Sequence, residues 1–429
     1  MTLDKQNFYQ ACNPSPLDLG NAQERKYYID FSSVRGENII NQLMRTIDLS
    51  ANMATCQLFT GHIGCGKSTE LQRFKVDLEK KNFHVVYVES GQVLETGDVD
   101  VTDIMLAIAQ SVSKNLEAID INLKPSYFVR LFGDIAKILQ TPIDISDVEF
   151  SVGIAKIIAQ TKDSPNLRDR LRACLEPRTK EIIDAINQEL LALAQERLIG
   201  IGKKGLVVIV DGLDKLANGR TPVDSPLPEY LFVDRGEQLN RLNCHVVYTI
   251  PLGLIFSQCL GRLTNIFGAH PKVLPMVPVQ LRQGGDCPEG MVLLQQMVMA
   301  RAFPDVNSAQ RLDLISQVFD RPATLERLCR VSGGHVRNLL MLIRKCMEEK
   351  DPPLSHDCIE KAIRASRNQF TKTINEDERD LLHQVRQTKT IAGSEQYQTL
   401  VRNLFVFEYQ DDIGSWFDVN PTLVEGSTF

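Results

Sequence analysis

One ten-residue stretch constrains the fold of this chain more than any other feature. Residues 60–69 read Thr-Gly-His-Ile-Gly-Cys-Gly-Lys-Ser-Thr and fit the pattern G-x-x-x-x-G-K-[ST]. Glycines let successive backbone N–H groups turn inward around a phosphate, and the N-terminus of a following helix favours negative charge. The stretch therefore predicts a phosphate-binding loop between a strand and a helix.

The residues on either side of the loop support this prediction. An apolar run at 57–59 precedes it, and Leu71, Phe74 and Leu78 follow it at helical spacing. In such a loop the lysine reaches the β- and γ-phosphates, and the serine hydroxyl binds Mg²⁺. We expect a nucleoside triphosphate, with ATP and Mg²⁺ as the bound species. The predicted nucleotide contacts are Gly61, His62, Ile63, Gly64, Cys65, Gly66, Lys67, Ser68 and Thr69, the last over the α-phosphate.

A second motif predicts the metal ligand. Residues 205–210 form an apolar run typical of a buried parallel strand, and the run ends at Asp211. A carboxylate at the C-terminal end of such a strand reaches the ligand at the edge of the sheet. We therefore expect Asp211 and Ser68 to bind Mg²⁺, directly or through water, and Asp214 to orient or deprotonate the attacking water.

The order of the apolar runs predicts the fold class. Five runs, at 57–59, 83–89, 205–210, 245–250 and 273–279, alternate with helical patterns. This order favours an α/β fold of three layers, a P-loop NTPase with a mostly parallel sheet. We expect an N-terminal arm over 1–30, the P-loop core over 31–281 with a helical insertion at about 91–204, a helical lid over 282–350, and a winged-helix domain over 351–429.

Composition narrows the remaining choices. The net charge is −6 and 43% of the residues are hydrophobic, as in an ordinary globular protein. No run of eighteen apolar residues occurs, and the first residues are too polar for a signal peptide, so we expect a cytoplasmic protein with no membrane contact. The ten cysteines show no C-x-x-C pair and are interpreted as reduced thiols.

Two further motifs carry a family resemblance. Arg-Gly-Glu at 35–37 precedes a helical pattern ahead of the loop, and Gly-Gly-His-Val-Arg-Asn stands at 333–338. Together with the loop and the acid-ended strand, they resemble P-loop ATPases of the STAND and origin-recognition-like AAA+ type. The resemblance implies that Arg35 borders the adenine and that Arg337, on the lid, reaches over the phosphates. The alternatives are a helix-start turn for Arg35 and a solvent-facing position for Arg337.

The same resemblance implies three other positions. Thr249 or Tyr248, at the end of a strand, occupies the sensor-one position that touches the γ-phosphate or its water, although β-propensity alone also explains a threonine there. Arg262 stands where related proteins carry an arginine finger toward a neighbouring subunit, the alternative being a surface arginine. Gly212 departs from the AAA+ pattern, because most members have a glutamate directly after the first aspartate. The catalytic carboxylate is therefore not fixed by the resemblance.

The resemblance implies an ATP-dependent molecular switch that couples nucleotide state to lid movement and to a protein partner or self-assembly. The alternative is a DNA-associated ATPase of the origin-recognition kind, which charge does not favour: residues 351–429 hold thirteen acidic and eight basic side chains, a net of −5. A metabolic kinase is a third hypothesis, and the motif at 333–338 and the appended domain oppose it. Adenine is preferred because no Asn-Lys-x-Asp segment for guanine occurs.

Overall fold

A five-stranded parallel sheet forms the centre of the molecule. The computed structural model describes residues 2–50, 53–95, 97–123, 125–139, 150–162, 164–216, 225–393 and 395–424. The sheet has the order β2-β3-β4-β1-β5, and every neighbouring pair is parallel. Its strands are β1 (Cys56–Gly61), β2 (His84–Glu89), β3 (Leu206–Asp211), β4 (His245–Thr249) and β5 (Lys272–Leu274).

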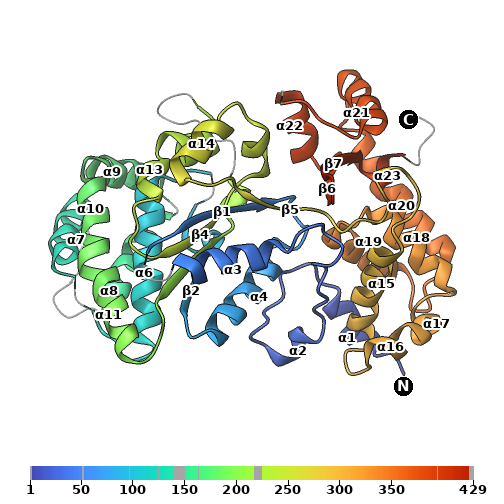
Figure 1. Ribbon diagram of the computed structural model, residues 1–429, viewed down its shortest axis with the longest axis horizontal. Helices are drawn as coiled ribbons and strands as arrows, with labels where there is room; N and C mark the ends of the chain where they lie inside the picture. The colour runs from blue at the N-terminus through green and yellow to red at the C-terminus, as the bar shows by residue number, and fades with distance from the viewer. Residues whose placement is uncertain are drawn as a thin grey trace.

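Helices cover both faces of the sheet, as Figure 1 shows. Alternate residues of a strand point to opposite faces. In β3, Val207 and Ile209 pack with helices α3 (Ile39–Ser50) and α4 (Lys67–Lys80), whereas Val208 and Val210 pack with α6 (Val101–Glu117). Burial on both faces explains why β3 is apolar throughout. The predicted three-layer α/β fold is confirmed.

The fifth strand is shorter than the sequence predicts. The apolar run continues to residue 279, but β5 ends at Leu274. Pro275 and Pro278 follow, and proline has no N–H for a sheet ladder. The N–H of Met276 instead donates to the carbonyl oxygen of Glu408 at 2.9 Å. The segment after β5 thus joins the core to the C-terminal part of the chain.

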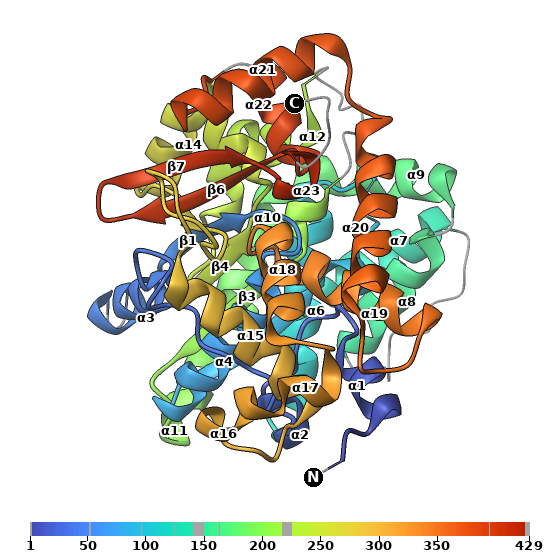
Figure 2. The same cartoon turned by 90° about the vertical axis from the view of Figure 1, so that its right-hand side faces the viewer.

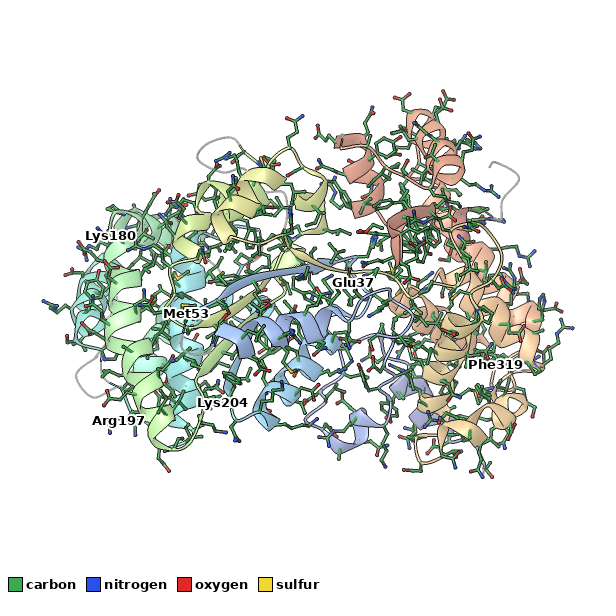
Figure 3. All side chains as sticks on the ribbon, in the orientation of Figure 1. Glu37, Met53, Lys180, Arg197, Lys204 and Phe319 are labelled. Carbon is green, nitrogen blue, oxygen red and sulfur yellow. The ribbon has the colours of Figure 1, made fainter. Side chains whose placement is uncertain are left out.

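Between α5 (Ser90–Val93) and Lys204, helices are the only regular secondary structure in the described residues, as predicted for an insertion. Two charged side chains of this unit, Lys180 and Arg197, lie on its outer surface (Figure 3), and both are exposed. The helices after α6 are α7 (Ser126–Leu139), α8 (Phe150–Lys162), α9 (Pro165–Leu175), α10 (Thr179–Ala185) and α11 (Ala192–Gly200).

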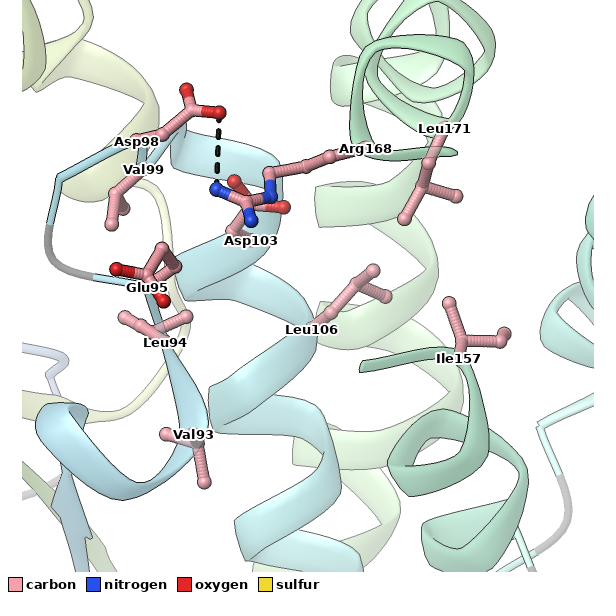
Figure 4. Close-up of a pocket in the computed structure, with 10 residues that line it drawn as sticks. All are labelled: Val93, Leu94, Glu95, Asp98, Val99, Asp103, Leu106, Ile157, Arg168 and Leu171. Atoms are coloured by element: carbon pink, nitrogen blue, oxygen red, sulfur yellow. Dashed lines mark hydrogen bonds and ion pairs between the residues drawn. The ribbon is translucent and has the colours of Figure 1, made fainter. Parts of the chain in front are cut away.

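A small cavity of about 40 Å³ lies inside the insertion (Figure 4). Leu106, Ile157 and Leu171 give it apolar walls. At its rim Arg168 pairs with Asp98 at 3.2 Å. Its lining residues do not include those of the glycine loop, so it belongs to the packing of the insertion.

A helical bundle follows the core, and Figure 2 shows it facing the viewer. Its core includes Phe319, which Figure 3 labels, together with Phe8 and Cys12 from the N-terminal segment. That segment therefore packs as part of the bundle. The helices are α15 (Pro288–Ala302), α16 (Ser308–Arg311), α17 (Ile315–Val318), α18 (Pro322–Ser332) and α19 (Val336–Glu349), joined by α1 (Lys5–Ala11), while α2 (Ala22–Arg25) follows α1.

The C-terminal unit combines helices with one antiparallel hairpin. The hairpin pairs β6 (Val406–Asp411) with β7 (Gly414–Val419). Phe407 and Tyr409 on one face pack against the core, while Val406 and Phe417 on the other pack within the unit. Its helices are α20 (His356–Thr371), α21 (Glu376–Thr388), α22 (Glu395–Arg402) and α23 (Pro421–Val424).

Candidate functional site

The glycine loop joins β1 to α4, as predicted, and its lysine is buried in ionic and polar contacts. Lys67 Nζ donates to the carbonyl oxygens of Gly61 at 2.7 Å and His62 at 2.9 Å, and pairs with Asp214 Oδ2 at 2.8 Å. Burial, the largest single influence, lowers the pKa of Lys67, but the charge and hydrogen bond of Asp214 together with the charges of Cys65 and Asp211 raise the pKa above its usual value. The lysine therefore stays charged, with its three N–H donors in use.

Asp211 lies where the sequence predicts, at the C-terminal end of β3. The hydroxyl of Tyr87, on the neighbouring strand β2, donates to Asp211 Oδ2 at 2.8 Å. Oδ1 is buried and has no hydrogen-bond partner within the described residues. One carboxylate oxygen is thus held in place and the other remains available to a cation.

The residues at this edge fit Mg²⁺ bound together with a phosphate. No group of three or more His, Cys, Asp or Glu side chains is placed to hold a metal ion in the described ranges. Mg²⁺ commonly takes one or two carboxylates and completes its shell with phosphate oxygens and water. Asp211 Oδ1 and the Ser68 hydroxyl, at the start of α4, are donors of this kind.

Thr249 supports the acidic segment from within the sheet. Its hydroxyl oxygen accepts hydrogen bonds from the N–H groups of Gly212 at 2.9 Å and Leu213 at 3.1 Å. The side chain is fully buried, so it positions the turn after β3. Tyr248 points to the opposite face, where its hydroxyl donates to the carbonyl oxygen of Leu239 at 3.2 Å.

Gly212 occupies a position that no side chain fits. Its φ is +95°, a left-handed value that glycine adopts without strain. A Cβ atom there would lie 2.5 Å from the hydroxyl oxygen of Ser90. A side chain at this position would be strained and would displace the Ser90 hydroxyl.

The start of α19 is bonded directly to the glycine loop. His335 Nε2 lies 2.7 Å from the carbonyl oxygen of Ile63, and the N–H of Arg337 donates to the carbonyl oxygen of Gly64 at 3.2 Å. His335 Nδ1 accepts from the N–H of Asn338, so Nε2 carries the proton in the neutral ring. A Cβ on Gly64 would lie 2.7 Å from the His335 ring. This position thus needs glycine for the approach of α19 as well as for the turn.

The C-terminal hairpin also contacts the loop. His62 Nε2 accepts a hydrogen bond of 2.8 Å from the N–H of Glu408. The ring of Phe407 meets His62 edge-on and stacks on His335, with centroids 5.7 Å away in both cases. Burial lowers the pKa of His62 to about 3 and that of His335 to about 4, so both rings are neutral at neutral pH.

The side chain of Arg35, from the segment before α3, contacts the glycine loop. Its guanidinium donates to the carbonyl oxygen of Cys65 at 2.7 Å and lies 3.8 Å from the carboxylate of Glu70. The side chain is buried and lies over the ring of Phe31. In this conformation Arg35 fixes the far side of the loop. Cys65, beneath it, is buried with Sγ 3.8 Å from the carbonyl oxygen of Leu274.

The N-terminal segment crosses the mouth of the site. The N–H of Leu17 donates to the Thr69 hydroxyl at 3.2 Å, and Arg301 Nε donates to the carbonyl oxygen of Ala11 at 3.0 Å. The cavity under this segment has a volume of about 60 Å³. It is lined by Pro14, Ser15, Pro16, Ile63, Gly64, Gly66, Lys67, Ser68, Thr69, Asp214, Lys215, Arg301, Val336, Arg337 and Leu340. Arg337 and the glycine loop thus share one cavity.

A larger cavity, of about 270 Å³, lies between the core and the C-terminal unit. Asp214 and Ile63 line both cavities, and Arg402 of α22 lines the larger one. Arg262 lies on α14 (Leu260–Phe267), is 63% exposed and pairs with Asp234 at 3.1 Å. Its predicted role toward a neighbouring subunit stays a prediction.

Sequence reasoning missed the contacts that link the units. His62 and His335 stand inside motifs that the sequence indicated, and Tyr87 lies in a predicted strand. Their partners are 346, 272 and 124 positions away. The strand pattern could have placed Tyr87 beside Asp211 had the strand order been known, whereas no local signal identifies the two histidine contacts.

The sheet, the glycine loop and the acid at the end of β3 define the class: a P-loop NTPase α/β fold. Two solved structures are similar over almost their whole length. The ORC2 protein of Aeropyrum pernix, solved as ADPNP–ADP complexes, is 10% identical with a TM-score of 0.41, covering 98% of this chain and 95% of that one. The Walker-type ATPase PABY2304 of Pyrococcus abyssi is 12% identical with a TM-score of 0.44, covering 96% and 98%.

No protein-family model matches the sequence, and neither does any curated protein. None of the helices in the described ranges is both long and apolar enough to cross a membrane. All ten cysteines are free thiols, as predicted.

Proposed function

We propose that this chain is an ATP-dependent molecular switch that hydrolyses ATP slowly and couples nucleotide state to the arrangement of its three units. One observation carries the proposal: the glycine loop is bonded to α19 through Ile63 and Gly64 and to the C-terminal hairpin through His62. A ligand that displaces these contacts of the loop acts on both units.

Lys67 supplies a two-state element at the centre of the site. Its three donors are taken by Gly61, His62 and Asp214. A triphosphate in the loop would draw this lysine to the β- and γ-phosphates and release Asp214. Because Asp214 also lines the cavity next to the C-terminal unit, its release offers a route from nucleotide to domain arrangement.

The size of the site supports a conformational change. Nucleotide-sized ligands occupy pockets of roughly 300 Å³ or more, whereas the cavity at the loop measures about 60 Å³ in this conformation. Entry of ATP therefore requires α19, the segment at 14–17, or both to move away from the loop. Residues 282–350 would then act as the lid, as the sequence predicts, with Arg337 over the phosphates.

The remaining roles follow from position. Ser68 and Asp211 would hold Mg²⁺, which when bound neutralises charge on the phosphate oxygens. Arg35 would support the loop and border the base. A protein partner or a second copy of the chain is favoured over DNA as the target of residues 351–429, proposed as a winged-helix domain, because their net charge of −5 repels phosphate.

The experiment that tests this proposal is small-angle X-ray scattering combined with size-exclusion chromatography, without nucleotide and with Mg²⁺ plus ATP or ADP. We expect ATP to change the radius of gyration or the assembly state. The change should disappear in Lys67→Ala and in Arg337→Ala, and persist in Lys350→Ala, a charge-matched control just beyond α19. Identical ATP responses in all four proteins would contradict the switch. Salt-dependent binding of duplex DNA would favour the DNA-associated alternative.

A further inference from the structure

We propose that Glu89, at the C-terminal end of β2, is the catalytic residue that accepts a proton from the water attacking the γ-phosphate. The inference rests on the proposed function and adds a residue that neither sequence motif indicates. It starts from the two positions expected to supply this carboxylate, because one of them carries no side chain and the proposed switch gives the other a different task.

The first expected position, directly after Asp211, is Gly212. Its left-handed backbone and the Ser90 hydroxyl exclude a side chain there. The second, Asp214, is 2.8 Å from Lys67 Nζ and forms a buried ion pair with it. Asp214 pairs with Lys67 while the loop is empty, so the proposed switch assigns Asp214 to the exchange of ion pairs and leaves the proton acceptor to another carboxylate.

The strand register places Glu89 beside the metal-binding acid. Glu89 of β2 pairs with Asp211 of β3 at the carboxyl edge of the sheet. Side chains alternate along a strand, so Glu89 shares a face with Val85 and Tyr87. Val85 belongs to the core on the α4 side, and Tyr87 packs against it. Glu89 therefore projects on the side of the sheet where the loop and α4 lie.

A hydrogen bond between the two strands supports this placement. The Tyr87 hydroxyl donates to Asp211 Oδ2 at 2.8 Å, which joins the two strands at their ends. Tyr87 and Glu89 of β2 thus lie beside Asp211 of β3 at the carboxyl edge of the sheet.

Glu89 also has the accessibility that the role requires. Its side chain is exposed, and Glu89 Oε2 accepts from Gln92 Nε2 at 2.5 Å, a contact with another exposed side chain. Asp211, in contrast, is buried. The two acids therefore divide the tasks, with Asp211 toward the cation and Glu89 toward water. A general base can tighten its contact with the attacking water only after the substrate has bound.

The step is balanced as follows. A water oxygen forms a bond to the γ-phosphorus while the bond from that phosphorus to the β,γ-bridging oxygen breaks. The electron pair of the broken bond leaves with ADP. One water proton passes to the Glu89 carboxylate and then to the released phosphate or to solvent, which returns Glu89 to its charged form.

The test compares Glu89→Gln with Glu95→Gln. Both variants replace an exposed glutamate by its neutral isostere, and Glu95 lies six positions on, at the cavity in the insertion (Figure 4). We expect Glu89→Gln to lower kcat about 100-fold or more, the usual contribution of a general base. Binding of Mg²⁺-ATP, measured by calorimetry, should change by less than about threefold, and Glu95→Gln should match the unmodified protein.

A second readout does not depend on steady-state rates. After incubation with ATP and rapid removal of free nucleotide, Glu89→Gln should retain ATP where the unmodified protein retains ADP. Turnover by Glu89→Gln within threefold of the unmodified protein would overturn the proposal, as would loss of ATP binding in this variant. ATP binding without turnover in the unmodified protein would also overturn it while leaving a nucleotide-binding switch in place. Failure of the unmodified protein to bind ATP would overturn the proposed function itself.

Discussion

The N–H of Glu408 donates to the imidazole of His62 at 2.8 Å, and this bond ties the C-terminal hairpin to the glycine loop. On the other side of the same loop, His335 bonds to Ile63. The Phe407 ring contacts both imidazoles. The core, the α15–α19 bundle and the C-terminal unit therefore meet at the residues that are expected to bind phosphate.

The first prediction concerns this bond. His62→Ala removes the acceptor and leaves the buried N–H of Glu408 without a partner, which costs roughly 1–3 kcal/mol. We expect the free energy of unfolding to fall by about this amount, and the amides of β6 to exchange with solvent faster. Denaturant titration and hydrogen exchange measure the two effects.

The matched control is His270→Ala. His270 is exposed, and its Nδ1 lies 3.2 Å from the Thr264 hydroxyl on the surface. Exposed substitutions of this kind usually change stability by less than about 0.5 kcal/mol. If both variants behaved alike, the contact between loop and hairpin would be incidental to stability.

The second prediction concerns the ion pair of Lys67 and Asp214. Asp214→Asn removes the negative charge that balances the buried Lys67, and breaking a buried ion pair in this way costs roughly 3–5 kcal/mol. We expect a lower Tm, part of which Mg²⁺-ADP restores because the phosphates supply the missing negative charge. Thermal unfolding with and without ADP gives both quantities.

The control is Asp234→Asn, which breaks the exposed pair with Arg262 and should cost no more than about 1 kcal/mol. An equal loss of stability in the two variants would show that the buried Lys67–Asp214 pair stabilises the fold no more than an exposed pair does.

The third prediction treats Tyr87 as a positioning residue for Asp211. Tyr87→Phe removes one hydroxyl and leaves the ring in place. Loss of such an outer contact commonly weakens metal binding by about 10- to 100-fold. We expect the Mg²⁺ concentration for half-maximal nucleotide binding to rise about tenfold or more, with no change in nucleotide binding in the absence of Mg²⁺. Tyr397→Phe, which removes a hydroxyl bonded to Gln384 in the C-terminal unit, is the control. An unchanged Mg²⁺ dependence in Tyr87→Phe would exclude this role.

The sequence predicts the parts of this molecule that depend on local pattern. The glycine loop, the strand ending at Asp211 and the helical insertion follow from spacing and from runs of apolar residues, and each lies where expected. The prediction of β5 is too long because the apolar run continues past Pro275 into a segment that bonds to the hairpin.

Contacts between distant residues were not predictable in the same way. The donor to His62 is a backbone N–H, which carries no signature of its own in the sequence. The hydroxyl of Thr249 faces the turn after β3 because the strand order places β4 beside β3, and strand order is not encoded in any one run. The site is therefore visible in the sequence as single residues, and only the fold shows which of them touch.

The last prediction uses the buried carboxyl of Glu408, whose Oε1 accepts from the Ser415 hydroxyl at 2.9 Å. Burial raises its pKa from 4.5 to about 7. Between these values the native state keeps a proton that the unfolded chain has released, so this group lowers stability as the pH rises through the window, and the full cost remains above pH 7. Glu408→Gln removes the cost. We expect it to stabilise the protein by up to about 3 kcal/mol at pH 8 and by far less at pH 5, as measured by thermal unfolding.

His62 and His335 lower stability as the pH falls below about 6.5, but they do so equally in both proteins and cancel in the difference. Glu349→Gln, at an exposed position, serves as the control. A difference between Glu408→Gln and the unmodified protein that does not vary with pH would show that the Glu408 carboxyl titrates normally in the folded chain.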